Sequence, residues 1–284
     1  MSVGAARVVV AAAAVVVAAC HGRRPAPAPT DARATAAAPD AIDHPATGPG
    51  SQAAAAGVRI PDPSTELVLV VTAGWTATTA QVSHWRRAAG GRWRPVRAPW
   101  PATVGAAGLG WGRGLHGDGA PAGEGGPVKA EGDRRAPAGI FALGPVFGVA
   151  PAAPPGARVR YTPTTARWRC VDDPASALYT RIVDEDAVVK DWASAEDLRR
   201  ADHRYDWVVD VRHNPAAAPG GGSCIFLHVW AGPDDATIGC TAMAEPDLRA
   251  LIATLDPAAR PVLVQLPVPA YTALADAWDL PPPP

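Results

Sequence analysis

The sequence predicts a mainly β domain, with strands in a closed or sandwiched sheet and only a few short helices. From residue 65 on, short runs of Val, Leu, Ile and aromatic residues alternate with Pro, Gly and Asp. Runs bounded in this way by turn residues are typical of strands joined in a meander. Few helical patterns separate these runs, which favours a closed or sandwiched sheet. The length of 284 residues is enough to bury a sizeable core.

The first twenty residues predict an export signal. Arg7 precedes twelve apolar residues, 8–19. Twelve is too few to span a bilayer, which needs about 20, but it suits the core of a signal peptide. The run ends in the letters VAAC, which resemble a bacterial lipoprotein cleavage box. We therefore expect residues 1–20 to be a lipoprotein signal, with lipid on Cys20 anchoring the exported protein on the periplasmic side of a membrane. The alternative is an ordinary cleaved signal peptide with a chance cysteine.

Residues 21–64 predict a disordered tether. They are rich in Ala and Pro, and Ile42 is the one large apolar residue between His21 and Gly57. Such a segment cannot bury enough apolar surface to offset the entropy of ordering. The folded domain is therefore expected over residues 65–284. With 26 basic and 27 acidic residues, the chain is nearly neutral, which argues against nucleic acid as a partner.

Eight runs of this domain are expected to form strands. They cover residues 66–75, 81–87, 92–99, 139–148, 157–163, 205–214, 223–230 and 260–267. The glycine-rich stretch 108–126 interrupts them and predicts a flexible surface loop near a cleft. It contains the letters GRGLHG, which match the dinucleotide pattern G-x-G-x-x-G, but no helix follows to hold a phosphate. We therefore expect no nucleotide cofactor.

Three segments carry helical signals. The stretch SAEDLRRAD (194–202) predicts a short helix, with Ser194 as N-cap and Asp197 three residues later. A second helix is expected from about residue 245, because apolar residues recur at i, i+3, i+4 and i+7. A closing helix is expected around residues 271–278.

The four cysteines divide by their surroundings. If Cys20 carries lipid, three remain in an oxidising compartment, and an odd count leaves one thiol free. Cys170 and Cys224 both border strand-like apolar runs, so a disulfide between them is possible and would add about 3–4 kcal/mol. The alternative is that both are buried free thiols. Cys240, in a glycine-bearing loop, is the unpaired cysteine by this reasoning.

An imidazole and a thiol are expected to meet at the end of the run 223–230. Alternation of side chains puts His228 and Trp230 on one face of that strand. A loop with the turn formers GPDD follows, and Cys240 comes twelve residues after His228. An adjacent imidazole can take the thiol proton and create a nucleophilic thiolate, which the dipole of the helix that follows would also favour. Gly239 lacks a Cβ, so amides near it could approach a developing oxyanion.

Two stretches together resemble the catalytic domain family of the L,D-transpeptidases. The letters CIFLHVWAGPDDATIGCTAMAEPDL (224–248) contain a strand histidine, a variable loop and a Ser/Thr-x-Gly-Cys turn. The letters VKAEGDRRAPAGIFAL (128–143) resemble the upstream block of that family. The resemblance implies a β-rich domain that acts on peptidoglycan stem peptides in the cell envelope through a cysteine acyl-enzyme, with no metal and no other cofactor.

Carried over residue by residue, the resemblance makes Cys240 the nucleophile and His228 the base. The amides of Gly239 and Cys240 would form the oxyanion hole, and Thr237 would orient the loop. Trp230 would form a wall for the stem peptide, although a core aromatic is an equal alternative.

Two departures bear on the substrate. Ile238 stands where family members often carry a histidine, and is a candidate substrate contact beside Trp230. Thr241 and Ala242 stand where many carry an arginine for the substrate carboxylate. We expect an L,D-transpeptidase. The alternatives are an L,D-carboxypeptidase or hydrolase with the same thiol chemistry, and a non-catalytic peptidoglycan-binding lipoprotein.

Overall fold

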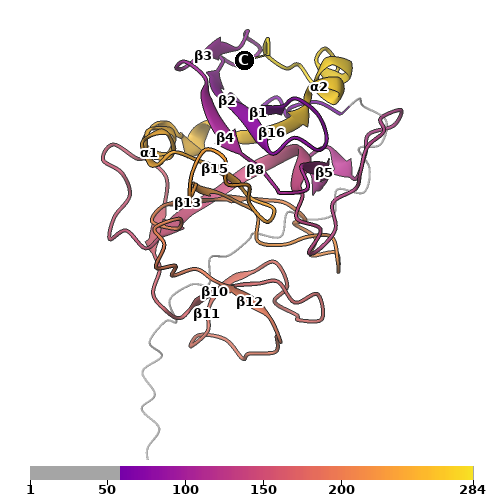
Figure 1. Ribbon diagram of the computed structural model, residues 1–284. Coiled ribbons are helices and arrows are strands. Elements are labelled where there is room, and N and C mark those ends of the chain that lie inside the picture. Colours follow the sequence, from indigo (N-terminus) through magenta and orange to yellow (C-terminus); the bar gives the residue numbers. More distant parts are fainter. Residues whose placement is uncertain (1–57, 284) are drawn as a thin grey trace, which may run out of the picture. The chain divides into compact units, whose positions relative to one another are not determined.

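An eleven-stranded sheet forms the centre of the structure, a computed structural model that describes residues 58–283 (Figure 1). Eight strands follow one another in the order β1-β16-β8-β13-β14-β15-β4-β2, and β2 pairs again with β1, so the sheet closes on itself. This confirms the prediction of a mainly β fold. The strands of the ring are β1 (Glu66–Thr72), β2 (Thr79–Arg86), β4 (Trp100–Thr103), β8 (Ala136–Gly148), β13 (Val208–Val211), β14 (Phe226–Val229), β15 (Thr241–Met243) and β16 (Val262–Pro267).

Three short strands extend this ring. β3 (Arg94–Pro95) pairs with β2, while β5 (Leu109–Trp111) and β9 (Tyr161–Pro163) pair with β8. The expectations for the signal peptide, for Cys20 and for tether residues 21–57 fall outside the described residues.

The strands β1 and β16 are buried along their whole length. They run parallel, with Leu67 opposite Val262 and Val71 opposite Leu266. A strand that is covered on both faces carries a near-continuous apolar run instead of alternating apolar and polar residues. This accounts for the sequence of β1, ELVLVVT.

Two α-helices flank the ring. α1 (Glu245–Thr254) packs against β14 through its buried Leu248, Leu251 and Ile252, which confirms the helix predicted from about residue 245. α2 (Val268–Leu274) continues from β16 and covers the predicted closing segment in part, with a 3-10 turn, η1 (Pro257–Ala259), before β16. Within the described part of the chain, neither helix has the length and apolar character that crossing a bilayer requires.

A smaller sheet replaces the helix that was predicted over residues 194–202. It has the order β11-β10-β12, with β10 at Trp168–Val171, β11 at Ile182–Asp184 and β12 at Ala195–Asp197. In the ladder, Cys170 lies opposite Glu196 and Arg169 lies opposite Asp197. The helix prediction was wrong because these cross-strand pairs, including an Arg169–Asp197 ion pair of 3.0 Å, outweigh the local capping signal.

The glycine-rich stretch 108–126 is not a flexible surface loop in its first half. It contains β5 and the hairpin of β6 (Arg113–Gly114) and β7 (Gly117–Asp118), and it buries Trp111 and His116. A Cβ at Gly114 would lie 2.3 Å from the carbonyl oxygen of Ile140. The glycine is therefore needed for close packing against β8.

The packed domain also starts earlier than residue 65. Ile60 is 1% exposed, and its N–H donates to the carbonyl of Trp278 at 3.3 Å. Residues 58–64 thus belong to the domain and not to the expected tether.

Candidate functional site

The sheet brings His228 and Cys240 to one pocket. β14 and β15 are parallel neighbours, with Leu227 opposite Thr241, so the chain enters β15 directly after Cys240 and beside the strand that carries His228. The segment that connects these two parallel strands is the short loop over residues 230–240, which was expected to fold back toward His228. Both residues line a cavity of about 180 Å³, together with parts of the segments 196–205 and 230–242.

The hydrogen bond of His228 fixes which ring nitrogen can act as a base. Nδ1 lies 2.7 Å from the carbonyl oxygen of Val229, which can only accept, so Nδ1 carries the proton. Nε2 therefore holds the lone pair. Burial lowers the pKa of His228 to about 4, so the imidazole is neutral at pH 7.

The thiol of Cys240 is protonated at rest. The side chain is buried, and Sγ donates to the carbonyl of Cys224 at 3.5 Å instead of to the imidazole. Burial raises the thiol pKa well above its usual value, and the nearby Glu196 carboxyl raises it further. The thiolate expected from the sequence is therefore absent from the resting site. A thiol in this state must lose its proton to react, because the thiolate is the nucleophilic form.

Thr237 holds the loop that precedes Cys240. Its hydroxyl donates to the carbonyl of Cys240 at 2.7 Å and accepts from the amide of Gly239 at 3.1 Å. Its own amide donates to the carbonyl of Val104 at 2.9 Å. Because the amide of Gly239 is occupied, it is not free to face an oxyanion. The Cys240 amide, for which we find no acceptor among the described residues, is the better donor for that role.

Gly239 is required by backbone conformation. Its φ is +153°, in the region that favours glycine. A Cβ there would lie 3.4 Å from the carbonyl oxygen of Arg135. Arg135 belongs to the block 128–143, so the two stretches that carry the family resemblance lie next to one another beside Cys240.

Ile238 and Trp230 border the same pocket. Ile238 is 75% exposed, which places an apolar side chain at the mouth of the pocket. Trp230 is partly buried, and its backbone N–H donates to the carbonyl of Met243 at 2.9 Å.

The segment 196–205 supplies four pocket residues that the sequence did not indicate. Tyr205 packs edge-on against the ring of His228, with centroids 5.2 Å apart, and its hydroxyl donates to Glu196. Arg200 and Arg204 bring positive charge to the pocket, and both pair with Asp202.

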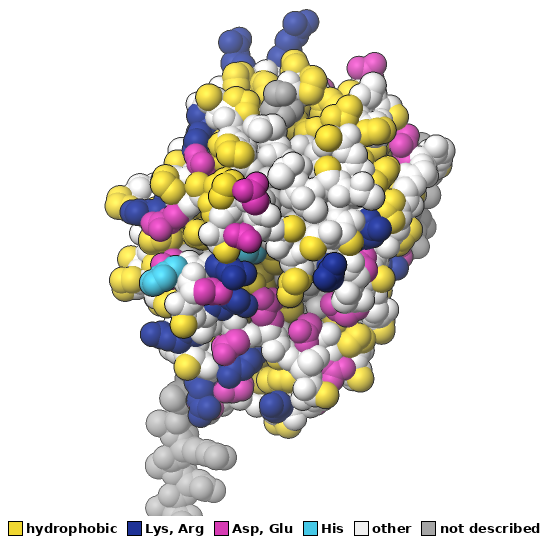
Figure 2. All heavy atoms as spheres, viewed as in Figure 1, with side chains coloured by type: hydrophobic (Ala, Val, Ile, Leu, Met, Phe, Trp, Pro, Cys, Tyr) yellow, Lys and Arg dark blue, Asp and Glu magenta, His cyan; other side chains and the backbone are white. Residues whose placement is uncertain are grey.

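Glu196 and Arg200 were missed because 194–202 was predicted to be a helix. Tyr205 was predicted only as the first residue of a strand over 205–214, and Arg204 lay between the two predicted elements. A signal for the pairing of β12 with β10 could have found Glu196. Figure 2 shows charged side chains of both signs interspersed over the lower half of the visible face, the half in which Figure 1 draws the smaller sheet.

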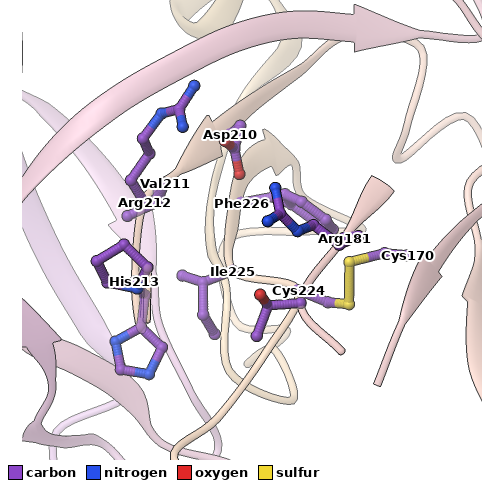
Figure 3. Close-up of a pocket in the computed structure, with 11 residues that line it drawn as sticks. Cys170, Arg181, Asp210, Val211, Arg212, His213, Cys224, Ile225 and Phe226 are labelled. Carbon is purple, nitrogen blue, oxygen red and sulfur yellow. A yellow bond between two sulfur atoms is a disulfide. The ribbon is translucent and has the colours of Figure 1, made fainter. Parts of the chain in front are cut away.

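A disulfide joins the smaller sheet to the chain that enters β14. Cys170 and Cys224 are bridged, with Cα atoms 5.9 Å apart (Figure 3). Figure 3 also shows Asp210 and Arg181 around the same small cavity. Since the carbonyl of Cys224 accepts from the thiol of Cys240, the disulfide also fixes the position of that acceptor.

A second connection lies beside the disulfide. The Glu131 carboxylate accepts from the hydroxyl of Tyr179 at 2.5 Å and from that of Ser223 at 2.7 Å. It therefore joins the segment between β10 and β11 to the chain just before Cys224.

Among residues 58–283, no group of three or more His, Cys, Asp or Glu side chains is placed to hold a metal ion. Comparisons with protein-family models, with curated proteins and with solved structures gave no match. The functional argument therefore depends on the geometry of the pocket and on the sequence motifs.

Proposed function

We propose that the protein is a cysteine acyltransferase of the cell envelope, an L,D-transpeptidase of a divergent branch, acting on peptidoglycan stem peptides. The observation that carries this proposal is the shared pocket of Cys240 and His228, in which Nε2 of the imidazole keeps a lone pair. The proximity of the blocks 128–143 and 224–248 beside Gly239 supports it. The closed, mainly β sheet is compatible with the family fold.

The reaction would proceed in two steps. In the first, Sγ of Cys240 attacks the carbonyl before the terminal D-amino acid of a tetrapeptide stem while Nε2 of His228 takes the thiol proton. His228 then gives that proton to the leaving amine, and a thioester remains. In the second, an amine of another stem attacks the thioester carbonyl, a C–N bond replaces the C–S bond, and the thiol is regenerated. The amide of Cys240 would bind the oxyanion in both steps.

The location of the reaction rests on the N-terminal sequence. The signal at residues 1–20 supports export, and lipid on Cys20 would hold the enzyme at a membrane surface facing its substrate. The near balance of charge supports a peptide partner and argues against nucleic acid.

The burial of Cys240 favours one alternative, a non-catalytic peptidoglycan-binding lipoprotein. Cys240 is 5% exposed, so a substrate must open the pocket before Sγ can reach a carbonyl. A protein of this class would bind stem peptides without reacting with them.

Incubation of the purified protein with a disaccharide tetrapeptide tests the proposal. We expect loss of the terminal D-amino acid, a mass adduct that maps to Cys240, and cross-linked dimer. A Cys240→Ser variant should form none of these, while Cys170 and Cys224 serve as internal controls because their sulfurs are bridged. Tripeptide without dimer would indicate a carboxypeptidase. Binding without any adduct would indicate the non-catalytic alternative.

A further inference from the structure

Glu196 brings a carboxyl group to the thiol pocket from the smaller sheet. In the β10–β12 ladder it lies directly opposite Cys170, and side chains of opposed residues share one face of a sheet. Cys170 packs in the same buried cluster as Cys240, so Glu196 faces the side of the sheet on which the thiol lies. Glu196, His228 and Cys240 all line the cavity of about 180 Å³.

The carboxyl of Glu196 has capacity for a further hydrogen bond. One oxygen accepts from the hydroxyl of Tyr205, and a carboxylate offers about four acceptor positions. The neighbouring Arg200 forms its ion pair with Asp202. The carboxylate is therefore available to a cationic group that enters the pocket.

Transfer of the acyl group to an amine requires a second base in the pocket, because the amine must lose two protons. A primary amine arrives as an ammonium ion and must lose two protons to become an amide N–H, whereas the departing thiolate takes back only one. A water acceptor has no such excess, because its proton can return to the thiolate. His228 can carry one proton between the acceptor and Sγ. The second proton needs another base near the thioester.

We propose that Glu196 binds the ammonium group of the acyl acceptor and takes its first proton, which makes it a catalytic residue for transfer to amines. This inference rests on the proposed function. The carboxylate accepts one proton from the ammonium ion and becomes a carboxylic acid. The free amine then attacks the thioester carbonyl, and His228 passes the second proton to sulfur as the C–S bond breaks. Glu196 finally releases its proton to solvent.

The surroundings of Glu196 suit this exchange. Burial raises its pKa to about 7, so the carboxyl can hold and release a proton near neutral pH. The titratable and charged groups that face it are Tyr205 and Arg200 from the following loop, Asp172 after β10, and Cys240.

The ratio of transfer to hydrolysis in a Glu196→Gln variant tests the proposal. With a tetrapeptide donor and Nα-acetyl-lysine amide as acceptor, we expect this ratio to fall at least tenfold, because glutamine cannot take the proton. Asp235→Asn is the matched control, because Asp235 is the other acid that lines the pocket and is exposed. An unchanged ratio in Glu196→Gln, or an equal fall in the Asp235 variant, would overturn the proposal.

A binding measurement separates this inference from the proposed function. In a Cys240→Ala background, we expect Nα-acetyl-lysine amide to bind more tightly than Nα-acetyl-norleucine amide, which lacks the ammonium group. The added Glu196→Gln substitution should abolish this preference. If Cys240 forms no acyl-enzyme, the proposed function fails, and this preference still decides whether Glu196 is an ammonium site.

Discussion

Removal of the Cys170–Cys224 disulfide should destabilise the domain strongly. The bridge joins residues 54 positions apart. For a loop of that length, the loss of chain entropy in the unfolded state corresponds to about 4 kcal/mol at 25 °C. The native fold keeps its other connection to the smaller sheet, through Glu131, Tyr179 and Ser223, so we expect the double variant to fold.

The measurement compares Cys170→Ala/Cys224→Ala with its parent, both in a Cys240→Ala background that prevents thiol exchange. Ten tryptophans allow guanidinium unfolding to be followed by fluorescence. We expect the free energy of unfolding to fall by about 4 kcal/mol, through a lower midpoint. A fall below about 1 kcal/mol would refute the reasoning that the bridge constrains the unfolded chain.

The same double variant with Cys240 restored tests the effect of the bridge on the thiol itself. The bridge fixes the carbonyl of Cys224, which accepts from the thiol of Cys240. Loss of the bridge should therefore expose the Cys240 side chain more often to solvent. The rate of labelling by a neutral thiol reagent should therefore rise. An unchanged rate would mean that the hydrogen bond to Cys224 survives without the bridge.

Three further predictions concern single positions. Burial raises the pKa of Asp210 from an ordinary 3.8 to about 6, so the stability linked to this group is complete below about pH 4 and is lost as the pH rises through 6. In urea unfolding, we therefore expect the free energy of unfolding of Asp210→Asn to exceed that of the parent by about 2–3 kcal/mol at pH 7.5, and to equal it at pH 4. Gly239→Ala should lower the free energy of unfolding by roughly 1–3 kcal/mol, measured by thermal unfolding, and should slow adduct formation at Cys240. Gly232→Ala is the control, because Gly232 lies in the same loop without a positive φ, and its loss of stability should be smaller. Equal losses would contradict the backbone argument. Alkylation of Cys240 should increase with pH across 6–9 without a plateau, because burial raises the thiol pKa; a plateau near pH 7 would indicate a resting thiolate.

Much of the ring could be predicted from the sequence because its strands are encoded locally. The apolar runs of β1 and β16 and the spacing of the buried leucines in α1 need no distant partner to be recognised. What the sequence does not encode locally is which strands pair. The parallel contact of β1 with β16 joins the first and last strands of the ring.

The smaller sheet shows why local signals can mislead. The segment SAEDLRRAD has a good N-cap and charged residues at helical spacing, yet three of its residues pair with β10. Their partners are residues 169–171, and such a pairing is a tertiary feature that a local signal does not encode. The same error concealed the position of Glu196 in the pocket. His228 and Cys240, in contrast, lie close enough in sequence for a turn-rich loop to indicate their proximity.

The protonated state of Cys240 is consistent with the neighbouring disulfide. Thiolates, not thiols, attack disulfides. Cys240 lies in the same buried cluster as Cys170, and its hydrogen bond goes to the residue on the other side of the bridge. A low-pKa thiolate at this position would exchange with the bridge and release the smaller sheet from β14. A buried, protonated thiol avoids this exchange. Under the proposed function, it becomes nucleophilic only when a bound carbonyl and Nε2 of His228 can share the developing charge. The raised pKa is therefore compatible with catalysis, provided that the substrate itself opens the pocket.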